Sequence, residues 1–235
     1  MATIESNSGG FFLKILAFDT STEYCSVALF LDDEIMSQEV LAGQRHSELV
    51  LPMVRQALAE AGLSLAQLDG IAFGAGPGSF TGLRIACGIA QGLAFGADLP
   101  VSGICTLEAL AQEAGGGRVI AAIDARMSQI YHAAYEEGPD VWELVTGPAL
   151  CSPQDAPLVS GDNWTGCGSG FDMYDQVLRA RYGQSIKHSI SGLRPHARSI
   201  VQLAAPRFAK GEGIDPADAT PLYIRNKVAL KEKER

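Results

Sequence analysis

Short apolar runs and helically spaced apolar residues alternate along the first half of the chain. Four runs are typical of buried β-strands, at residues 15–18, 25–31, 68–73 and 101–104. Three other stretches are predicted to be helices, over residues 44–61, 81–95 and 107–113. Ser79 is placed to cap the second helix, and Pro52 to kink the first or mark an early turn in it.

The start of the second half repeats this opening pattern. A strand predicted over residues 119–123 leads through Asp124 into a returning strand over 129–135, just as the strand over 15–18 leads through Asp19 into its own return. Asp19 and Asp124 therefore hold matching places. The repetition fits two related lobes, but strand–Asp–turn patterns also recur by chance, so both explanations stay open.

Glycines at residues 115–117 mark the predicted boundary between the lobes. We expect four parts: a disordered extension at 1–13, a first lobe at 14–114, a smaller second lobe at 115–225 and a charged tail at 226–235. Within the second lobe we expect a glycine-rich turn at 164–170 and helices over 172–181 and 197–210. The last helix either stays with the second lobe or packs back on the first.

Charge and cysteine content narrow the classes of function. The chain has 27 acidic and 18 basic residues, a net charge of −9, whereas a free-standing nucleic-acid binder normally carries a basic face. A role on RNA would therefore need a basic partner. The five cysteines are scattered without a CxxC pair, which argues against zinc and redox sites and fits a reducing cytoplasm. No apolar run looks long enough to span a membrane, and the polar leader resembles neither a signal nor a transit peptide.

Two turns are candidates for phosphate binding. Asp19, Thr20 and Ser21 follow the first strand, where backbone N–H groups and hydroxyls could cradle a phosphate. The same residues can close a hairpin by local hydrogen bonds, and the sequence favours that structural role. The glycine-rich loop at 74–79 leads into a helix whose N-terminus would attract anions, although its glycines also permit a tight strand-to-helix turn. Neither turn matches a Walker A motif.

The helix after the glycine-rich loop lacks a polar stripe. Along this helix and the strands beside it only Arg84 and Asp98 carry charge, so we expect the helix to be buried on more than one side. Gly88, Gly92 and Gly96 fall on one of its faces, at a cost of about 1 kcal/mol each relative to alanine. Such a stripe predicts close approach of another helix, from this chain or, as we favour, from a partner chain.

Several motifs resemble those of the bacterial TsaB (YeaZ) family. The most specific is GAGPGSFTGLR at residues 74–84, and supporting stretches lie at 15–22, 45–48, 123–126 and 221–225. The resemblance runs from about Lys14 to Arg225. It implies an α/β, actin-like (ASKHA) fold of two lobes with duplicated mixed sheets flanked by helices, as in sugar kinases and heat-shock ATPases.

The resemblance also implies a cytoplasmic role in forming N6-threonylcarbamoyladenosine on tRNA. In that family the protein is a non-catalytic subunit that binds the catalytic paralogue TsaD and the ATPase TsaE. It forms a homodimer when alone and meets tRNA only through the complex. The resemblance implies no cofactor or metal of its own, while ATP or ADP could bind at the complex interface.

On this resemblance, the glycine-striped helix and the helix over 44–61 pack together on the equivalent helices of the partner. The expected interface residues are His46, Leu49, Met53, Gln56, Arg84, Cys87, Gly88, Gln91, Gly92 and Phe95. The first four are expected along an outer stripe of their helix, part of which could instead be ordinary packing. Arg84 either makes a charged contact at the interface or ties down the glycine-rich loop. A vestigial nucleotide site would comprise Asp19, Thr20, Ser21 and Asp124.

Two departures from the catalytic relatives favour a non-catalytic subunit. TsaD-like proteins carry an HxxxH metal pair at the positions of Thr106 and Leu110, and neither side chain can replace imidazole. Asp124 is followed by Ala125 and Arg126 rather than by a phosphate-wrapping Gly-Gly-Thr turn. The alternative function is a free-standing actin-like ATPase or phosphotransferase that uses Asp19 and Asp124. A peptidase is disfavoured, because no nucleophile–base set is recognisable.

Overall fold

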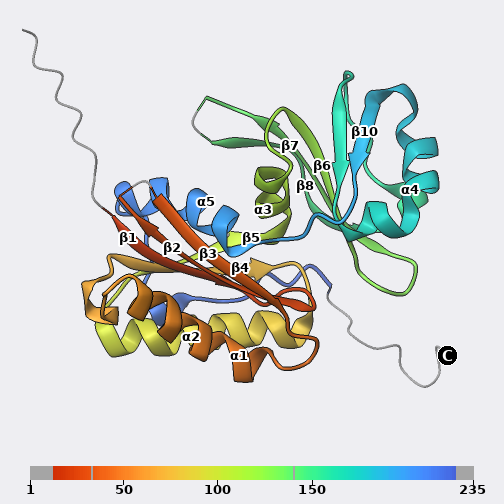
Figure 1. The fold of residues 1–235 in the computed structure, drawn as a ribbon. Helices are drawn as coiled ribbons and strands as arrows, with labels where there is room; N and C mark the ends of the chain where they lie inside the picture. The colour runs from red at the N-terminus through yellow and green to blue at the C-terminus, as the bar shows by residue number, and fades with distance from the viewer. Residues whose placement is uncertain (1–12, 33, 140, 226–235) are drawn as a thin grey trace, which may run out of the picture.

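The computed structural model describes residues 13–32, 34–139 and 141–225, which form two lobes, each built on a five-stranded mixed sheet (Figure 1). The first sheet has the order β3-β2-β1-β4-β5, from β1 (Lys14–Asp19), β2 (Tyr24–Leu31), β3 (Glu34–Leu41), β4 (Gly70–Gly76) and β5 (Val101–Cys105). The second has the order β10-β9-β6-β7-β8, from β6 (Arg118–Asp124), β7 (Ile130–Glu137), β8 (Trp142–Cys151), β9 (Trp164–Cys167) and β10 (Ile186–Ile190). The predicted extension, except Leu13, and the predicted tail lie outside the described residues.

The two sheets share one topology. In the first, β1 pairs antiparallel with β2 and parallel with β4. In the second, β6 pairs antiparallel with β7 and parallel with β9, and each sheet continues with one more antiparallel and one more parallel strand. Asp19 ends β1 and Asp124 ends β6. This shared topology confirms the duplicated two-lobed α/β fold and decides against chance repetition.

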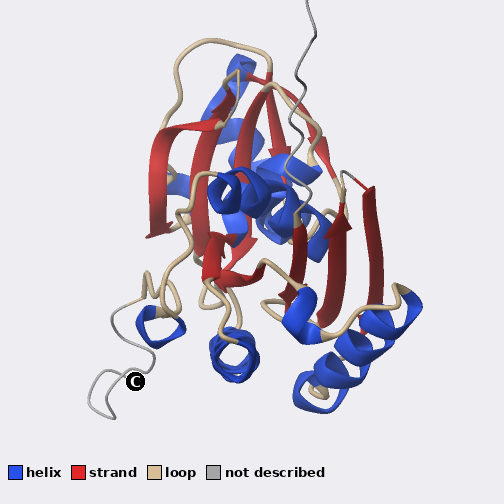
Figure 2. Cartoon of the chain, turned by 90° about the vertical axis from the view of Figure 1, so that its left-hand side faces the viewer, coloured by secondary structure: helices blue, strands red, loops and turns tan. Residues whose placement is uncertain are grey.

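Helices cover both faces of the first sheet (Figures 1 and 2). The helices are α1 (His46–Glu60), α2 (Phe80–Ala97), α3 (Thr106–Glu113), α4 (Ser169–Tyr182) and α5 (Ala197–Ala209). Helices α1 and α2 pack on one face, and α5 on the other, where α3 lies between the two sheets. Helix α4 covers the far face of the second sheet. Because both faces of β1 are buried, its sequence is a continuous apolar run rather than an alternating one.

The end of the described chain returns to the first lobe. Helix α5 packs on β1 and β2, and the residues after it run back along the first sheet. Ile214 forms a β-bridge with Val101, and the Leu222 amide donates to the Ala75 carbonyl at 2.7 Å. We refer to residues 214–225 as the C-terminal strap, which lies against α2 and the glycine-rich loop.

Most strands and all of the predicted helices have counterparts, but three sheet edges were not predicted. Strands β3, β8 and β10 each form an edge, where exposed positions break the apolar pattern. The glycine-rich turn predicted at 164–170 is wrong in its first part, because residues Trp164–Cys167 form β9. Four residues that include Thr165 and Gly166 are too few to show a strand pattern. Likewise β4 continues to Gly76, which shortens the predicted loop.

The prediction that no segment is long enough to span a membrane needs correction. Helix α2 reaches that length and apolarity by composition alone, because alanine, glycine and aliphatic residues fill it. One side of α2 packs on the first sheet, and sheet-packed helices of this kind pass the same test.

Candidate functional site: the Asp19 turn and the outer face of α1 and α2

The turn after β1 is closed on itself. Asp19 is 1% exposed, and its Oδ1 accepts hydrogen bonds from the amide and hydroxyl of Ser21 at 3.0 and 2.8 Å. The other oxygen, Oδ2, has no hydrogen-bond partner among the described residues. Burial raises the pKa of the Asp19 carboxyl to about 7, against the lowering effect of the Ser21 hydrogen bonds. The Thr20 hydroxyl donates to the Gly82 carbonyl at 2.7 Å.

Three glycines press directly on this turn. A Cβ atom on Gly74 would lie 1.9 Å from Asp19 Oδ2, and one on Gly78 would lie 2.7 Å from the Ser21 carbonyl oxygen. A Cβ on Gly82 would lie 1.8 Å from the Thr20 carbonyl oxygen. The glycines therefore let the loop and the start of α2 pack directly against the turn, which is the structural alternative to phosphate binding. This packing leaves no gap for a phosphate between the loop and the turn.

The four residues of the predicted vestigial nucleotide site do not form one cluster. Asp19, Thr20 and Ser21 lie together and are buried. Asp124 makes its described contacts within the second lobe: its carboxylate accepts from the Arg126 amide at 3.1 Å and from the Tyr174 hydroxyl at 3.4 Å. The structure therefore brings three of these residues together and leaves the fourth apart.

The positions that carry the metal pair in TsaD-like proteins serve packing here. The Thr106 hydroxyl donates to the Pro77 carbonyl, which fastens the start of α3 to the glycine-rich loop. Leu110 is fully buried in the core between α3 and the second sheet. Across the part of the chain that the structure describes, no three His, Cys, Asp or Glu side chains gather to hold a metal ion.

The glycine stripe of α2 faces out of the molecule. Gly88, Gly92 and Gly96 are exposed, and a Cβ atom on any of them would meet nothing within 4 Å. Phe95 beside them is 62% exposed. The expectation that α2 is buried on more than one side is confirmed in part, because the sheet, α1 and the strap all contact it, whereas its glycine face is open. No helix of the described chain uses the close approach that the glycines allow.

Helix α1 presents a different outer stripe from the one predicted. Gln56 is exposed and Leu49 half-buried, as an outer stripe requires. His46 and Met53 point inward, at 6% and 9% exposure, which corrects their predicted place. His46 Nε2 lies 3.2 Å from the Tyr24 carbonyl, where it holds the start of α1 to β2. Leu51, at 41% exposure, is an outward residue that the sequence reasoning missed.

Two further predicted interface residues contact the C-terminal strap. Cys87 is buried, its thiol donating to the Ala219 carbonyl at 3.4 Å, and burial raises its pKa. Gln91 donates to the same carbonyl at 3.2 Å. These side chains fasten the strap to α2, so Cys87 is not on the outer face. No local signal could reveal this, because Ala219 lies far along the chain.

Arg84 also contacts the strap. Its Nε donates to the Tyr223 hydroxyl at 2.9 Å, and its guanidinium lies 3.8 Å from the centroid of the Phe80 ring. Leu222, next to Tyr223, donates its amide to the Ala75 carbonyl in the glycine-rich stretch. The Arg84–Tyr223 hydrogen bond therefore links α2 to that stretch through the strap. Of the two roles predicted for Arg84, the geometry within the chain matches the second.

Known proteins share both the sequence and the fold. Residues 31–225 match the family model described as "TsaD: tRNA N6-adenosine threonylcarbamoyltransferase". The "tRNA threonylcarbamoyladenosine biosynthesis protein TsaB" of Escherichia coli is 38% identical, covering 93% of this chain and 97% of its own length. Its namesake from Haemophilus influenzae is 40% identical, covering 93% and 96%.

Among solved structures, "YeaZ from Pseudomonas aeruginosa" is similar to this chain with a TM-score of 0.83 and 40% identity. The match covers 90% of this chain and 99% of that one. Sequence and structure thus agree over nearly the whole length of the relatives. The chain belongs to the TsaB (YeaZ) family of tRNA threonylcarbamoyladenosine biosynthesis proteins, with the actin-like fold of that family.

Proposed function

We propose that this protein is a non-catalytic subunit of the complex that forms N6-threonylcarbamoyladenosine on tRNA. In this proposal the outer face of α1 and α2 binds a TsaD-type catalytic subunit. The observation that carries it is the open glycine stripe of α2, with the exposed Phe95 on the same helix and the exposed Leu51 on α1. An apolar face of this kind is typical of an interaction surface.

The energetics of the stripe support a partner. Each glycine within a helix costs about 1 kcal/mol relative to alanine, and Gly88, Gly92 and Gly96 repay that cost through no contact inside the described chain. Without side chains at these positions, a second helix can approach the α2 backbone closely. A helix of a partner, or of a second copy of this chain when the partner is absent, would use that approach.

The remaining parts of the proposal follow from the same complex. A TsaE-type ATPase would join it, with ATP or ADP at the subunit junction, and the net charge of −9 fits a subunit that meets tRNA only through a more basic partner. The cytoplasm is the expected compartment. Thr106 and Leu110, in place of metal-ligating histidines, support leaving the transfer chemistry to the partner.

Light scattering after size exclusion tests the interface. The chain alone should behave as a homodimer, and addition of the TsaD paralogue should convert it into a one-to-one complex. Gly92→Leu should weaken both associations at least about tenfold, because a bulky side chain holds the helices apart. Ala180→Leu adds similar bulk to an exposed position of α4 in the second lobe and should leave both associations unchanged.

Modification assays test the function. With all partners present, omission of this chain should abolish threonylcarbamoyladenosine formation, and Gly92→Leu should reduce it in proportion to the lost complex. A monomer that ignores the paralogue contradicts the proposal. ATP turnover by the purified chain that disappears in Asp19→Ala would favour the phosphotransferase alternative instead.

A further inference from the structure

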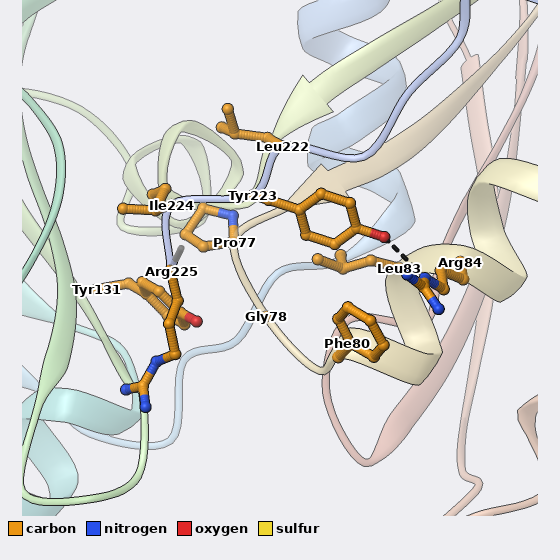
Figure 3. Close-up of a pocket in the computed structure, with 10 residues that line it drawn as sticks. All are labelled: Pro77, Gly78, Phe80, Leu83, Arg84, Tyr131, Leu222, Tyr223, Ile224 and Arg225. Atoms are coloured by element: carbon orange, nitrogen blue, oxygen red, sulfur yellow. Dashed lines mark hydrogen bonds between the residues drawn. The ribbon is translucent and has the colours of Figure 1, made fainter. Parts of the chain in front are cut away.

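A cavity of about 430 Å³ opens where the two lobes and the C-terminal strap meet (Figure 3). The glycine-rich loop and the first turns of α2 form one wall, with Phe80 and Arg84. Strand β7 of the second lobe supplies Tyr131, and the strap supplies Tyr223 and Arg225. The volume lies within the range of small-molecule binding sites.

The charge of this cavity differs in sign from that of the whole chain. Among the residues that the structure describes, Arg84 and Arg225 are the only charged ones that line it. Neither forms an ion pair with a carboxylate among the described residues. Within the described part of the chain these two cations have no carboxylate partner, so they create a local positive potential that attracts an anion, although the net charge of the chain is −9.

The two guanidinium groups have different tasks. Arg225 is engaged with the second lobe, because its Nη2 donates to the Ala125 carbonyl and to Gln129 Oε1, both at 2.9 Å. Arg84 donates only its Nε, to the Tyr223 hydroxyl, while its planar face rests on the Phe80 ring. Its two terminal nitrogens make no hydrogen bond to any described residue. Arg84 is thus a fixed fork with its donor edge available for a bidentate oxyanion.

The rest of the lining is largely apolar or aromatic. Leu83 and Leu222 contribute aliphatic surface, and the rings of Phe80 and Tyr223 lie together with centroids 5.6 Å apart. Tyr131 stands on the opposite, second-lobe side (Figure 3). A ligand held by Arg84 would therefore place a flat apolar body between these walls, where a ring can contact aromatic faces.

We propose that this cavity binds a small carboxylic acid that carries an aromatic ring. One available guanidinium fork matches one planar carboxylate in both charge and geometry. The remaining volume and its apolar lining match the ring. Arg84 lies one helical turn before Gly88, at the end of the outer glycine stripe. Ligand occupancy is nevertheless measured on the chain alone and is a separate readout from association with a partner, so failure of this proposal and failure of the proposed function are distinguishable.

Calorimetric or NMR titration of the full chain with 3-phenylpropionate tests the site, with 3-phenylpropionamide as the uncharged control. The acid should bind about tenfold more tightly than the amide, since a hydrogen bond to a charged group is lost with the charge. Arg84→Gln should remove this preference, so that acid and amide bind equally weakly. Arg55→Gln removes an exposed arginine of α1 and should preserve the preference.

Further variants and probes test the role of the ring and the class of the ligand. Tyr131→Ala should weaken both probes, because the ring loses a wall, and the thermal unfolding of each variant should match that of the parent chain. Equal binding of acid and amide, an unchanged preference in Arg84→Gln, or no binding of either probe overturns the proposal. Tighter binding of phenyl phosphate than of the acid also overturns it, because the ligand class would then be phosphate esters.

Discussion

Thr20 and Gly82 meet with no room for a side chain between them. The Thr20 hydroxyl donates to the Gly82 carbonyl at 2.7 Å, while a Cβ on Gly82 would lie 1.8 Å from the Thr20 carbonyl oxygen. This contact fastens the first turn of α2 onto the turn after β1. Because the Thr20 carbonyl oxygen belongs to the backbone, it cannot move aside as the end of a flexible side chain would.

Gly82→Ala should therefore destabilise the protein by about 2–3 kcal/mol, the cost of overpacking a closed contact. Gly92→Ala lies on the same helix with open space around its Cβ, and should stabilise the chain by up to about 1 kcal/mol through helix propensity. Urea denaturation of the two variants measures the difference. Equal stabilities would mean that the Thr20 contact can relax.

Asp19 should give the stability a distinct pH dependence. Burial raises its pKa from 3.8 to about 7 in the folded chain, so the folded state binds the proton more tightly than the unfolded state does. Its contribution is complete below pH 4 and is lost as the pH rises towards 7, by at most about 4 kcal/mol. Asp19→Asn cannot ionise, so it should become more stable relative to the parent as the pH rises.

Unfolding curves of both proteins from pH 5 to 8.5 measure this effect as a difference. The difference is needed because His132 gives the stability an opposite pH dependence. Burial lowers the pKa of His132 to about 4, so its contribution to the stability of the protein is lost as the pH falls. A difference between parent and Asp19→Asn that stays constant with pH would show that Asp19 is ionised throughout.

Tyr182 supports a buried histidine in the second lobe. Its hydroxyl lies 2.7 Å from His132 Nε2, and both residues are buried. Tyr182→Phe should cost about 1–3 kcal/mol, because the ring nitrogen loses its partner where water cannot replace it. Tyr174→Phe, which removes a longer hydrogen bond to Asp124, should cost less than about 1 kcal/mol. Similar losses in the two variants would contradict this reading of the buried pair.

Substitution of Phe95 should weaken association without affecting folding. Its side chain is 62% exposed, so Phe95→Ala should change the unfolding free energy of the isolated chain by no more than about 0.5 kcal/mol. If the outer face of α2 is the interface, the same variant should weaken association by about 2 kcal/mol, as loss of an aromatic anchor does. Unchanged association in sedimentation experiments would move the interface away from this end of α2.

The sequence predicted the central strands well, because β1 is covered on both faces and forms an unbroken apolar run. It missed β3 and β8, whose outer positions, such as Met36 and Leu144, are exposed. The spacing of Gly88 and Gly92 identified the outward face of α2, because glycine destabilises a helix and its repeated use on one face indicates a contact made there. Cys87 was misplaced, because what covers it is the distant strap, and contacts across such separations leave no local pattern.

The return of α5 and the strap means that the first lobe is not continuous in sequence. Its sheet is complete at Cys105, yet the face that α5 covers has only α3 against it until α5, beginning at Ala197, has been made. During synthesis the second lobe therefore emerges while the first still exposes apolar surface. The order of assembly therefore need not follow the lobe order, because the middle of the chain can fold as a unit before the lobe that begins it.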